Sequence, residues 1–300
     1  METLGVYSRR CAQAKATLRI VTFTPNVDAM VSAPAQENPR KTARWRYVVP
    51  NAITCASLLV GLVAIGTAFV VGGYTDAAWL VVLSVLLDKL DGTAARMLKA
   101  TSAIGMQLDS FADFVTFGIA PGTVLFAAGM QANKANATTL WGGEAGLWLL
   151  GAACATFVLC ACIRLAKFNV LMDDLPPDAP KVFYGMPTTF AGGLMAILWI
   201  LGDKYQVSWA VEALPLVAVG LGLLMVSNLP LPKLVLRKEK WINAIQVFSV
   251  VATYVCGLFR ILPEYLAFNI AVYAAVGFAW GALNRKRLLA YKRLDPYPDE

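Results

Sequence analysis

Four aspartates lie in two neighbouring segments of this chain that are otherwise apolar. Asp88 and Asp91 are three residues apart. Asp109 and Asp113 are four apart, so each pair shares one face of a helix. Counted outward from Thr101 in the short connector, Asp91 and Asp109 fall at nearly equal depth, and the other two form a deeper tier. A helix rises about 1.5 Å per residue, which puts the tiers about 5 Å apart and predicts four carboxylates converging between antiparallel helices.

Carboxylates gathered in a region of low dielectric need cations, since they repel one another and lose their hydration. Ligands made only of oxygen favour Mg²⁺ or Mn²⁺, and two such ions about 4 Å apart are a common arrangement for phosphoryl transfer. The alternative is a structural cluster neutralised by Lys89, Arg96 and Lys99. Ionisable groups inside apolar helices usually serve function, so the pattern favours a metal site. The chain contains no histidine, which leaves carboxylate, lysine, tyrosine or cysteine for acid–base chemistry.

The composition predicts an integral membrane protein. Hydrophobic residues make up 58% of the 300 and charged residues 15%, whereas about 25% charged is usual in soluble proteins. Apolar stretches of about 20 residues are long enough to cross a bilayer as helices. We therefore expect an all-α fold, a polytopic bundle of about eight transmembrane helices. The expected spans are 52–72, 76–98, 106–129, 145–168, 186–202, 208–229, 243–260 and 264–284.

The positions of the 26 lysines and arginines predict the orientation of these spans. All but Lys134, Lys204 and Arg260 lie in the amino-terminal arm, in alternate connectors or in the carboxyl-terminal tail. Because positive residues favour the cytoplasmic side, we expect both termini and the acidic hairpin to face the cytoplasm from the cytoplasmic, or inner, membrane. The net charge of +7 gathers at the ends of the spans, which indicates membrane lipids and not nucleic acid as the partner.

The aspartates belong to a longer pattern of eight residues within 26 positions. It reads Asp88-x2-Asp91-Gly92-x2-Ala95-Arg96-x8-Gly105-x3-Asp109-x3-Asp113. This pattern resembles the signature of the CDP-alcohol phosphatidyltransferases, with every defining residue at the family's spacing. The resemblance covers roughly 48–240 and implies transfer of a phosphatidyl group from a CDP-activated lipid to an alcohol. It divides the chain into a basic cytoplasmic arm with an interfacial segment (1–47), the transferase core (48–240), and two further transmembrane helices with a basic tail (241–300).

The same resemblance implies roles for individual residues. Asp88, Asp91 and Asp109 would ligate metal. Asp113 would be a ligand to a second ion and also the general base. The residues expected to contact the CDP-lipid are small or polar, namely Asn51, Gly92, Ala95, Arg96 and Gly105.

Four shorter stretches are similar to the phosphatidylserine synthases of this family. They are Asp109–Pro121, Arg164–Asn169, Phe183–Pro187 and Ser227–Lys233. They imply CDP-diacylglycerol as donor, L-serine as acceptor, and a homodimer as the assembly. Arg164, Lys167, Asn169 and Lys233 would then bind the acceptor or a phosphate. From the residues alone, anchoring by side chains that snorkel to the membrane surface explains Arg164 and Lys167 equally well.

Two alternatives remain open at this point. The same chemistry with glycerol phosphate, inositol phosphate or choline as acceptor would keep the metal site. Phosphorylated acceptors call for more basic residues than Arg164, Lys167 and Lys233 provide. A cation-coupled transporter also carries acids within the membrane, but it predicts internal repeats and acids at the midplane, and neither is evident here.

Overall fold

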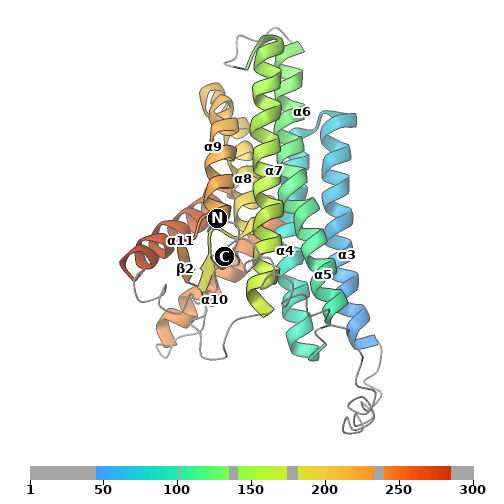
Figure 1. Cartoon of the computed structure of the whole chain (residues 1–300), viewed down its shortest axis with the longest axis vertical. Coiled ribbons are helices and arrows are strands. Elements are labelled where there is room, and N and C mark those ends of the chain that lie inside the picture. Colours follow the sequence, from blue (N-terminus) through green and yellow to red (C-terminus); the bar gives the residue numbers. More distant parts are fainter. Residues whose placement is uncertain (1–44, 101, 135–140, 174–181, 233–239, 285–300) are drawn as a thin grey trace, which may run out of the picture. The chain divides into compact units, whose positions relative to one another are not determined.

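The computed structural model of the chain describes residues 45–100, 102–134, 141–173, 182–232 and 240–284. By its internal contacts the chain divides into Met1–Ala43, which lies outside these ranges, and Arg44–Glu300, to which all that follows refers. The described part is almost entirely helical, and most of its helices run side by side (Figure 1). Most of the predicted arm, 1–47, therefore lies outside the described residues.

Helical segments occur at all eight predicted positions. Two of these segments are composite, because a short π-helix (η) lies within or at the end of an α-helical run. In chain order the elements are α3 (Trp45–Gly66), η1 (Thr67–Val71), α4 (Tyr74–Leu98), α5 (Ala103–Asp113), η2 (Phe114–Ile119), α6 (Ala120–Lys134), α7 (Gly143–Asp173), β1 (Val182–Tyr184), α8 (Thr188–Lys204), α9 (Ser208–Val226), β2 (Pro230–Pro232), α10 (Lys240–Leu258) and α11 (Pro263–Leu283).

Four of the helical segments are both long and apolar enough to cross a membrane. They are Arg46–Val71, Ala103–Lys134, Gly143–Val170 and Pro263–Leu283. The segment α4 is long enough, but Asp88, Lys89 and Asp91 lower its apolar character, and α8 has only 17 residues. The helical character of the fold is confirmed, whereas the number of eight spans stays a prediction.

The helix that carries Asp109 and Asp113 changes its winding directly after the second of them. The π-helix η2 begins at Phe114 and is followed by Pro121 in the first turn of α6. Proline has no backbone N–H to donate, and short π-helical turns absorb such interruptions and occur often at functional sites. The continuous segment Ala103–Lys134 therefore has its irregular turn next to Asp113.

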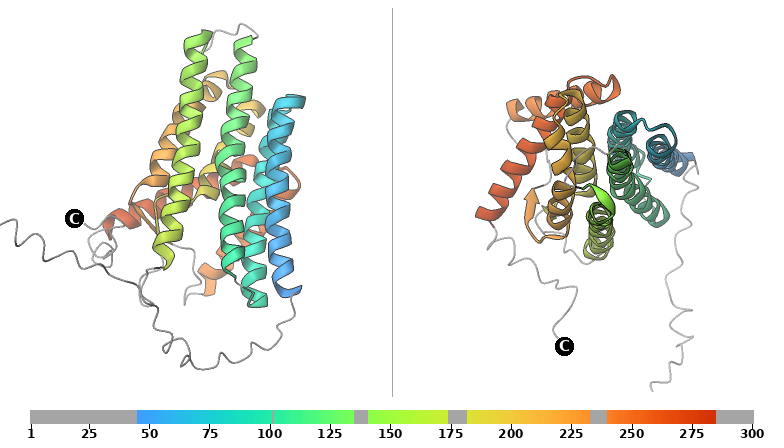
Figure 2. Two further views of the ribbon diagram at one scale, coloured as in Figure 1. Left: turned by 45° about the vertical axis from the view of Figure 1, so that its right-hand side comes forward. Right: turned by 90° about the horizontal axis from the view of Figure 1, so that it is seen from above.

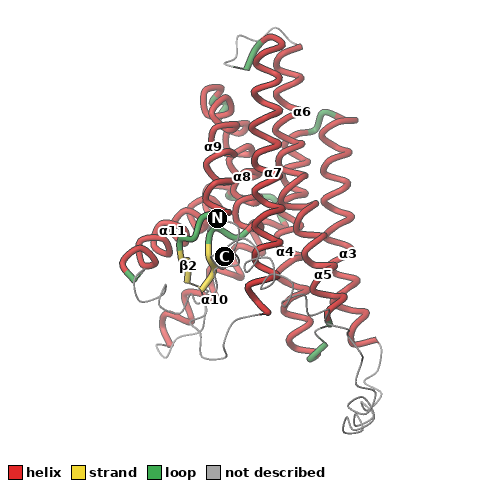
Figure 3. Tube along the Cα trace, viewed as in Figure 1, coloured by secondary structure: helices red, strands yellow, loops and turns green. Residues whose placement is uncertain are grey.

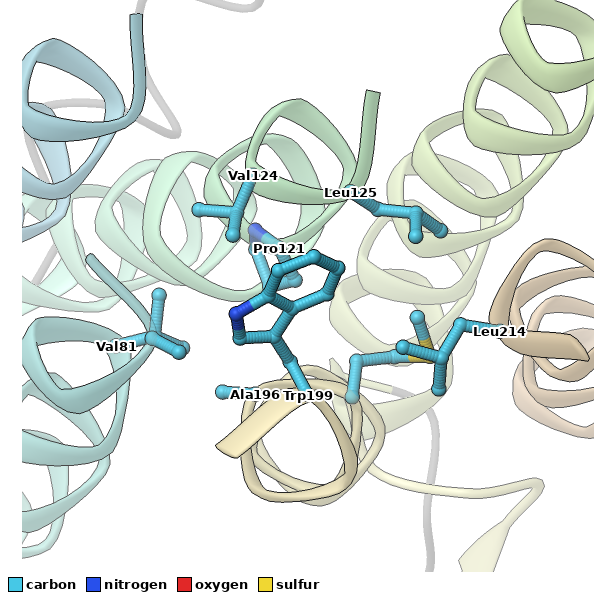
Figure 4. Close-up of a pocket in the computed structure, with 9 residues that line it drawn as sticks. Val81, Pro121, Val124, Leu125, Ala196, Trp199 and Leu214 are labelled. Carbon is cyan, nitrogen blue, oxygen red and sulfur yellow. The ribbon is translucent and has the colours of Figure 1, made fainter. Parts of the chain in front are cut away.

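Two apolar clusters fill the space between the helices, and α8 contributes to both. One cluster joins α8 to α3, α4 and α6, and the other joins it to α6, α7 and α9. Between α4, α6, α8 and α9 lies a cavity of about 10 Å³, room for about one water molecule (Figure 4). The indole Nε1 of Trp199 has no hydrogen-bond acceptor among the described residues. None of the predicted site residues lines this cavity.

A two-stranded ribbon is the departure from an all-helical fold within the described ranges (Figure 3). The strands β1 and β2 are antiparallel, with Phe183 opposite Leu231. The Gly185 N–H donates to the Leu229 carbonyl at 2.8 Å, and by the alternation of antiparallel pairs Phe183 and Leu231 occupy the next hydrogen-bonded pair. Pro230 therefore lies at a position where no ladder N–H is required, which is how a strand tolerates proline.

Gly185 is the residue that turns the chain out of this ribbon toward α8. Its φ of +78° lies in the left-handed region, and a Cβ there would overlap the Met225 carbonyl oxygen. We expect Gly185→Ala to destabilise the protein by about 1–2 kcal/mol or more. This loss corresponds to a fall in Tm of about 2–8 °C in detergent solution, measured by thermal unfolding.

Gly220 on α9 provides the matched control. A Cβ at Gly220 would meet no atom within 4 Å, so Gly220→Ala adds helix propensity without a clash. Equal Tm values for the two variants would show that the turn at Gly185 does not require glycine.

Candidate active site

Three of the four predicted carboxylates meet between α4 and α5. One oxygen each from Asp88, Asp91 and Asp109 lies within 4.8 Å of the others, and Asp91 is buried. Oxygen atoms at this separation, with no nitrogen or sulfur ligand among them, suit a hard divalent ion such as Mg²⁺ or Mn²⁺. The sequence predicted Asp91 and Asp109 at nearly equal depth, with Asp88 and Asp113 in a deeper tier. The structure groups Asp88 with Asp91 and Asp109 and leaves Asp113 outside this group.

The hairpin between the two helices brings the carboxylates together. The helix α4 ends at Leu98. Its C-cap residue Lys99 has a left-handed φ of +50°, and the Ala100 N–H donates to the Ala95 carbonyl at 3.0 Å. The helix α5 begins with Ser102 as its N-cap, and the Ser102 hydroxyl accepts from the Gly105 N–H at 3.0 Å. This tight connection keeps α4 and α5 adjacent at the lower end of the bundle in Figure 1.

A threonine on α3 holds one of the carboxylates and was not predicted as a site residue. The buried Thr54 hydroxyl lies 2.7 Å from Asp91 Oδ2 and 3.1 Å from the Pro50 carbonyl oxygen. A hydroxyl has one proton, and the stronger bond goes to the ionised acceptor, so Thr54 donates to Asp91 when that carboxylate is charged. The one feature of the sequence that could have indicated Thr54 as a site residue is its position about one helical turn after Asn51 in an apolar helix.

Lys89 neutralises Asp88, but Asp88 still lies close to Asp91 and Asp109. Lys89 forms an ion pair with Asp88 at 2.7 Å, while its side chain stays 53% exposed. Asp91 has Thr54 as its side-chain partner in the described part of the chain. Of the three cations in the structural alternative, Lys89 pairs with Asp88, whereas the Arg96 guanidinium donates to the Thr93 hydroxyl at 3.3 Å.

Asp113 lies one helical turn beyond Asp109 and outside the group of three. Its charge interacts with those of Asp88 and Asp109 and with the opposite charges of Lys89 and Arg164. Asp113 is thus close enough to the acidic cluster and to Arg164 of α7 for its charge to interact with both. Its predicted roles as ligand and base stay predictions.

The residues predicted to contact the CDP-lipid fall into two groups near the carboxylates. A Cβ at Gly105 would lie 3.0 Å from Asn51 Oδ1, so the absence of a side chain lets α3 approach α5 there. A Cβ at Gly92 would lie 3.6 Å from Arg96 Nη1, so the Arg96 side chain folds back along its own helix, where Nη2 donates to the Thr93 hydroxyl at 3.3 Å. The structure therefore brings Asn51 beside Gly105 and Arg96 beside Gly92.

The basic residues on α7 are held inside the protein by neighbouring elements. Arg164 is only 7% exposed, donates from Nη1 to the Thr188 hydroxyl at 2.9 Å, and lies over the Phe168 ring at 5.0 Å. This burial argues against a side chain that snorkels to the membrane surface. Thr188 is a neutral acceptor, so the guanidinium keeps capacity for an anion, which a buried charge requires.

Two further side chains of α7 connect it to other parts of the site. Lys167 donates to the side-chain oxygen of Asn228, and the Asn169 amide donates to Ser110 Oγ at 3.0 Å. Ser110 follows Asp109 on α5, so this hydrogen bond joins α7 to the helix that carries Asp109 and Asp113. The predicted residue Lys233 lies outside the described residues. Sequence reasoning missed the partners Ser110, Thr188 and Asn228.

A cluster of acids on a helical hairpin, a buried arginine on α7 and four helices apolar enough to cross a membrane define a helical membrane protein with a site suited to an anionic substrate. Residues 47–224 match the CDP-alcohol phosphatidyltransferase family. The chain belongs to this family of transferases.

Individual relatives support the same assignment. A CDP-diacylglycerol–serine O-phosphatidyltransferase of Helicobacter pylori strain J99 is 34% identical over 236 residues, which cover 77% of this chain and 90% of the relative. Proteins of the same name from Mycobacterium bovis and Bacillus subtilis are 30% and 33% identical, over 251 and 185 residues. These alignments cover 81% and 61% of this chain, and 80% and 89% of the relatives.

The Thr54–Asp91 hydrogen bond generates a prediction about metal affinity. Thr54→Val keeps the shape of the side chain but removes the donor that orients Asp91. We expect Mn²⁺ to bind on the order of tenfold more weakly, the usual effect of losing a partner of a metal ligand. Titration of the purified variant, with free Mn²⁺ followed by electron paramagnetic resonance, measures this change without activity.

Thr54→Ser is the control, because it retains the hydroxyl and should bind Mn²⁺ nearly as well as the parent protein. An unchanged Mn²⁺ affinity in Thr54→Val would contradict the orienting role of Thr54.

Proposed function

We propose that this chain transfers the phosphatidyl group of CDP-diacylglycerol to the hydroxyl of L-serine, with phosphatidylserine and CMP as products. The meeting of Asp88, Asp91 and Asp109 within 4.8 Å carries this proposal, since it offers a diphosphate substrate a metal site within the family's own pattern. The names of the relatives in three bacterial species support serine as the acceptor.

The reaction exchanges one bond at phosphorus for another. The serine oxygen forms a bond to the phosphorus that carries diacylglycerol. The bond from this phosphorus to the bridging oxygen of the diphosphate breaks, and CMP leaves with the electron pair. The proton of the serine hydroxyl passes to a base, for which we propose Asp113.

The residues available to hold metal are Asp88, Asp91 and Asp109, with Asp113 as the ligand to a second ion. When bound, Mg²⁺ or Mn²⁺ would stabilise negative charge on the phosphoryl and leaving-group oxygens. The chain's own contribution is to hold these carboxylates in place through the hairpin and through Thr54.

Two observations support Asp113 as the base. The chain has no histidine, the most common general base in enzymes. Asp113 also interacts electrostatically with both the acidic cluster and Arg164. A carboxylate there can take the proton of an acceptor that Arg164 binds.

The basic and polar residues of α7 are the proposed acceptor site. Arg164 and Lys167 would bind the serine carboxylate, since a guanidinium binds a carboxylate through two parallel hydrogen bonds. Asn169 and Lys233 complete the proposed set. The burial of Arg164 and its single recorded hydrogen bond, to a neutral threonine, support this assignment for the described part of the site.

The surroundings of the reaction are part of the proposal. The distribution of lysine and arginine supports an active site and termini that face the cytoplasm. We retain the homodimer and the division into 1–47, 48–240 and 241–300 as parts of the same proposal.

An acceptor panel tests the reaction. Purified protein in detergent is given CDP-diacylglycerol, Mn²⁺ or Mg²⁺, and one of L-serine, glycerol 3-phosphate, inositol phosphate or choline. We expect CMP release with serine only, in equal amount to phosphatidylserine, and none after chelation of the metal. CMP with a different acceptor would reassign the substrate, and no CMP with any acceptor would refute the transferase reaction.

Asp113→Asn tests the base. This variant keeps the size of the side chain and removes its ability to accept the proton, so we expect turnover to fall by roughly 10²–10⁴-fold. The fold and most of the bound Mn²⁺ should be retained, as measured by thermal unfolding and by Mn²⁺ titration.

Asp76→Asn is the matched control on α4. Asp76 forms an exposed ion pair with Arg260 at 2.8 Å, and exposed pairs contribute little to stability. Its turnover should equal that of the parent protein. Full turnover in Asp113→Asn would remove Asp113 from the role of base.

A further inference from the structure

The last described helix, α11, packs directly against the strand β2. Tyr273, Gly277 and Gly281 are spaced by four and share one face of α11. The Tyr273 hydroxyl donates to the Pro232 carbonyl at 2.8 Å. A Cβ at Gly277 would lie 2.5 Å from the Leu231 side chain. One at Gly281 would overlap the Pro230 carbonyl oxygen, so glycine permits the backbones of helix and strand to approach closely.

The ribbon depends on this contact because it is small. Each strand has three residues, and β2 has proline at its first and last positions. An isolated pair of short strands is marginally stable at best and needs packing against another element. Leu231, at the centre of β2, is only 1% exposed, and Gly277 of α11 supplies part of its cover. The position of β2 is therefore set in part by α11, which crosses the other helices obliquely (Figure 2).

Three contacts connect the ribbon, or residues next to it, to α7 at or beside its basic residues Arg164 and Lys167. Beyond β1 the chain reaches Thr188, which accepts from Arg164. Just before β2 lies Asn228, which accepts from Lys167. On β1 itself, the Phe183 ring packs against the Phe168 ring with centroids 6.2 Å apart. All three contacts join the ribbon, or the residues next to it, to one face of the C-terminal half of α7.

We propose that α11 is a positioning element of the acceptor site, acting through the ribbon, with Tyr273, Gly277 and Gly281 as its positioning residues. The helix lies beyond residues 47–224, which match the family, and far in sequence from the acids. A shift of the ribbon moves the partners of Arg164 and Lys167 while leaving the hairpin of carboxylates in place. Displacements of about 1 Å in binding groups are enough to change substrate binding strongly. This inference rests on the proposed function, in which Arg164 and Lys167 bind serine.

Gly281→Ala is the first test, with Gly220→Ala as the matched control. The new Cβ at position 281 forces α11 and β2 apart, whereas the one at position 220 meets nothing within 4 Å. We expect the KM for serine to rise about tenfold in Gly281→Ala, with the KM for CDP-diacylglycerol within about twofold of the parent value. Gly220→Ala should match the parent protein in both constants.

Tyr273→Phe is the second test and keeps the proposal falsifiable if Gly281→Ala fails to fold. It removes one hydroxyl from α11 and leaves the ring stacked on Phe190, whose centroid is 4.9 Å away. Loss of the hydrogen bond to Pro232 should raise the KM for serine about threefold to tenfold. The KM for CDP-diacylglycerol and the thermal midpoint should change little.

Three results would overturn the proposal. They are an unchanged KM for serine in the folded variants, an equal rise in KM for both substrates, and a fall in kcat alone. If the parent protein uses an acceptor other than serine, the proposed function fails separately, and the KM for that acceptor tests α11 in the same way.

Discussion

Repulsion among Asp88, Asp91 and Asp109 is the constraint on which the rest of this structure depends. Three carboxylates held within 4.8 Å inside a helical bundle raise the free energy of the fold unless cations and hydrogen-bond donors offset their charge. The short connection holds the adjoining ends of α4 and α5 together, and α3 packs against both helices. Thr54 from α3 and Lys89 from α4 supply the donor and the positive charge that the described residues provide. A divalent ion bound to the three carboxylates would offset the remaining repulsion between their charges.

The basic half of the site is assembled in a different way. Arg164 and Lys167 lie on α7 and meet partners from α8 and from the residues before β2, so several elements fix them instead of one hairpin. Arg164 is buried and has an aspartate, Asp113, as one of its charged neighbours. Acidic residues that suit metal and a basic residue that suits anions thus lie close enough to interact. This arrangement fits the proposed reaction, in which an anionic diphosphate donor meets an acceptor that carries a carboxylate.

The family signature and the elements that support it occupy different parts of the chain. All four aspartates lie within residues 47–224, which match the family. The strand β2 and the helix α11 follow this region. The strand β2 pairs with β1, which leads to Thr188, and α11 contacts β2, which comes directly after the segment that contains Asn228. The glycines of α11 and the residues of β2 lie in close contact. A side chain at Gly277 would collide with Leu231, and one at Gly281 would collide with Pro230, so this packing requires glycine at both positions.

The sequence by itself was sufficient to predict the helical class, the eight helical segments and the pairing of Asp91 with Asp109. These features follow from local periodicity and from a short connector, which act over a few residues. The partners Thr54, Ser110, Thr188 and Asn228 could not be predicted, since they come from distant segments and their residue types are common on any helix. The ribbon was not predicted, because each strand has only three residues and the strands are 45 residues apart in the sequence. Nothing in the intervening sequence indicates that the two strands pair. Tertiary packing decided these contacts, because they depend on where whole helices lie in space.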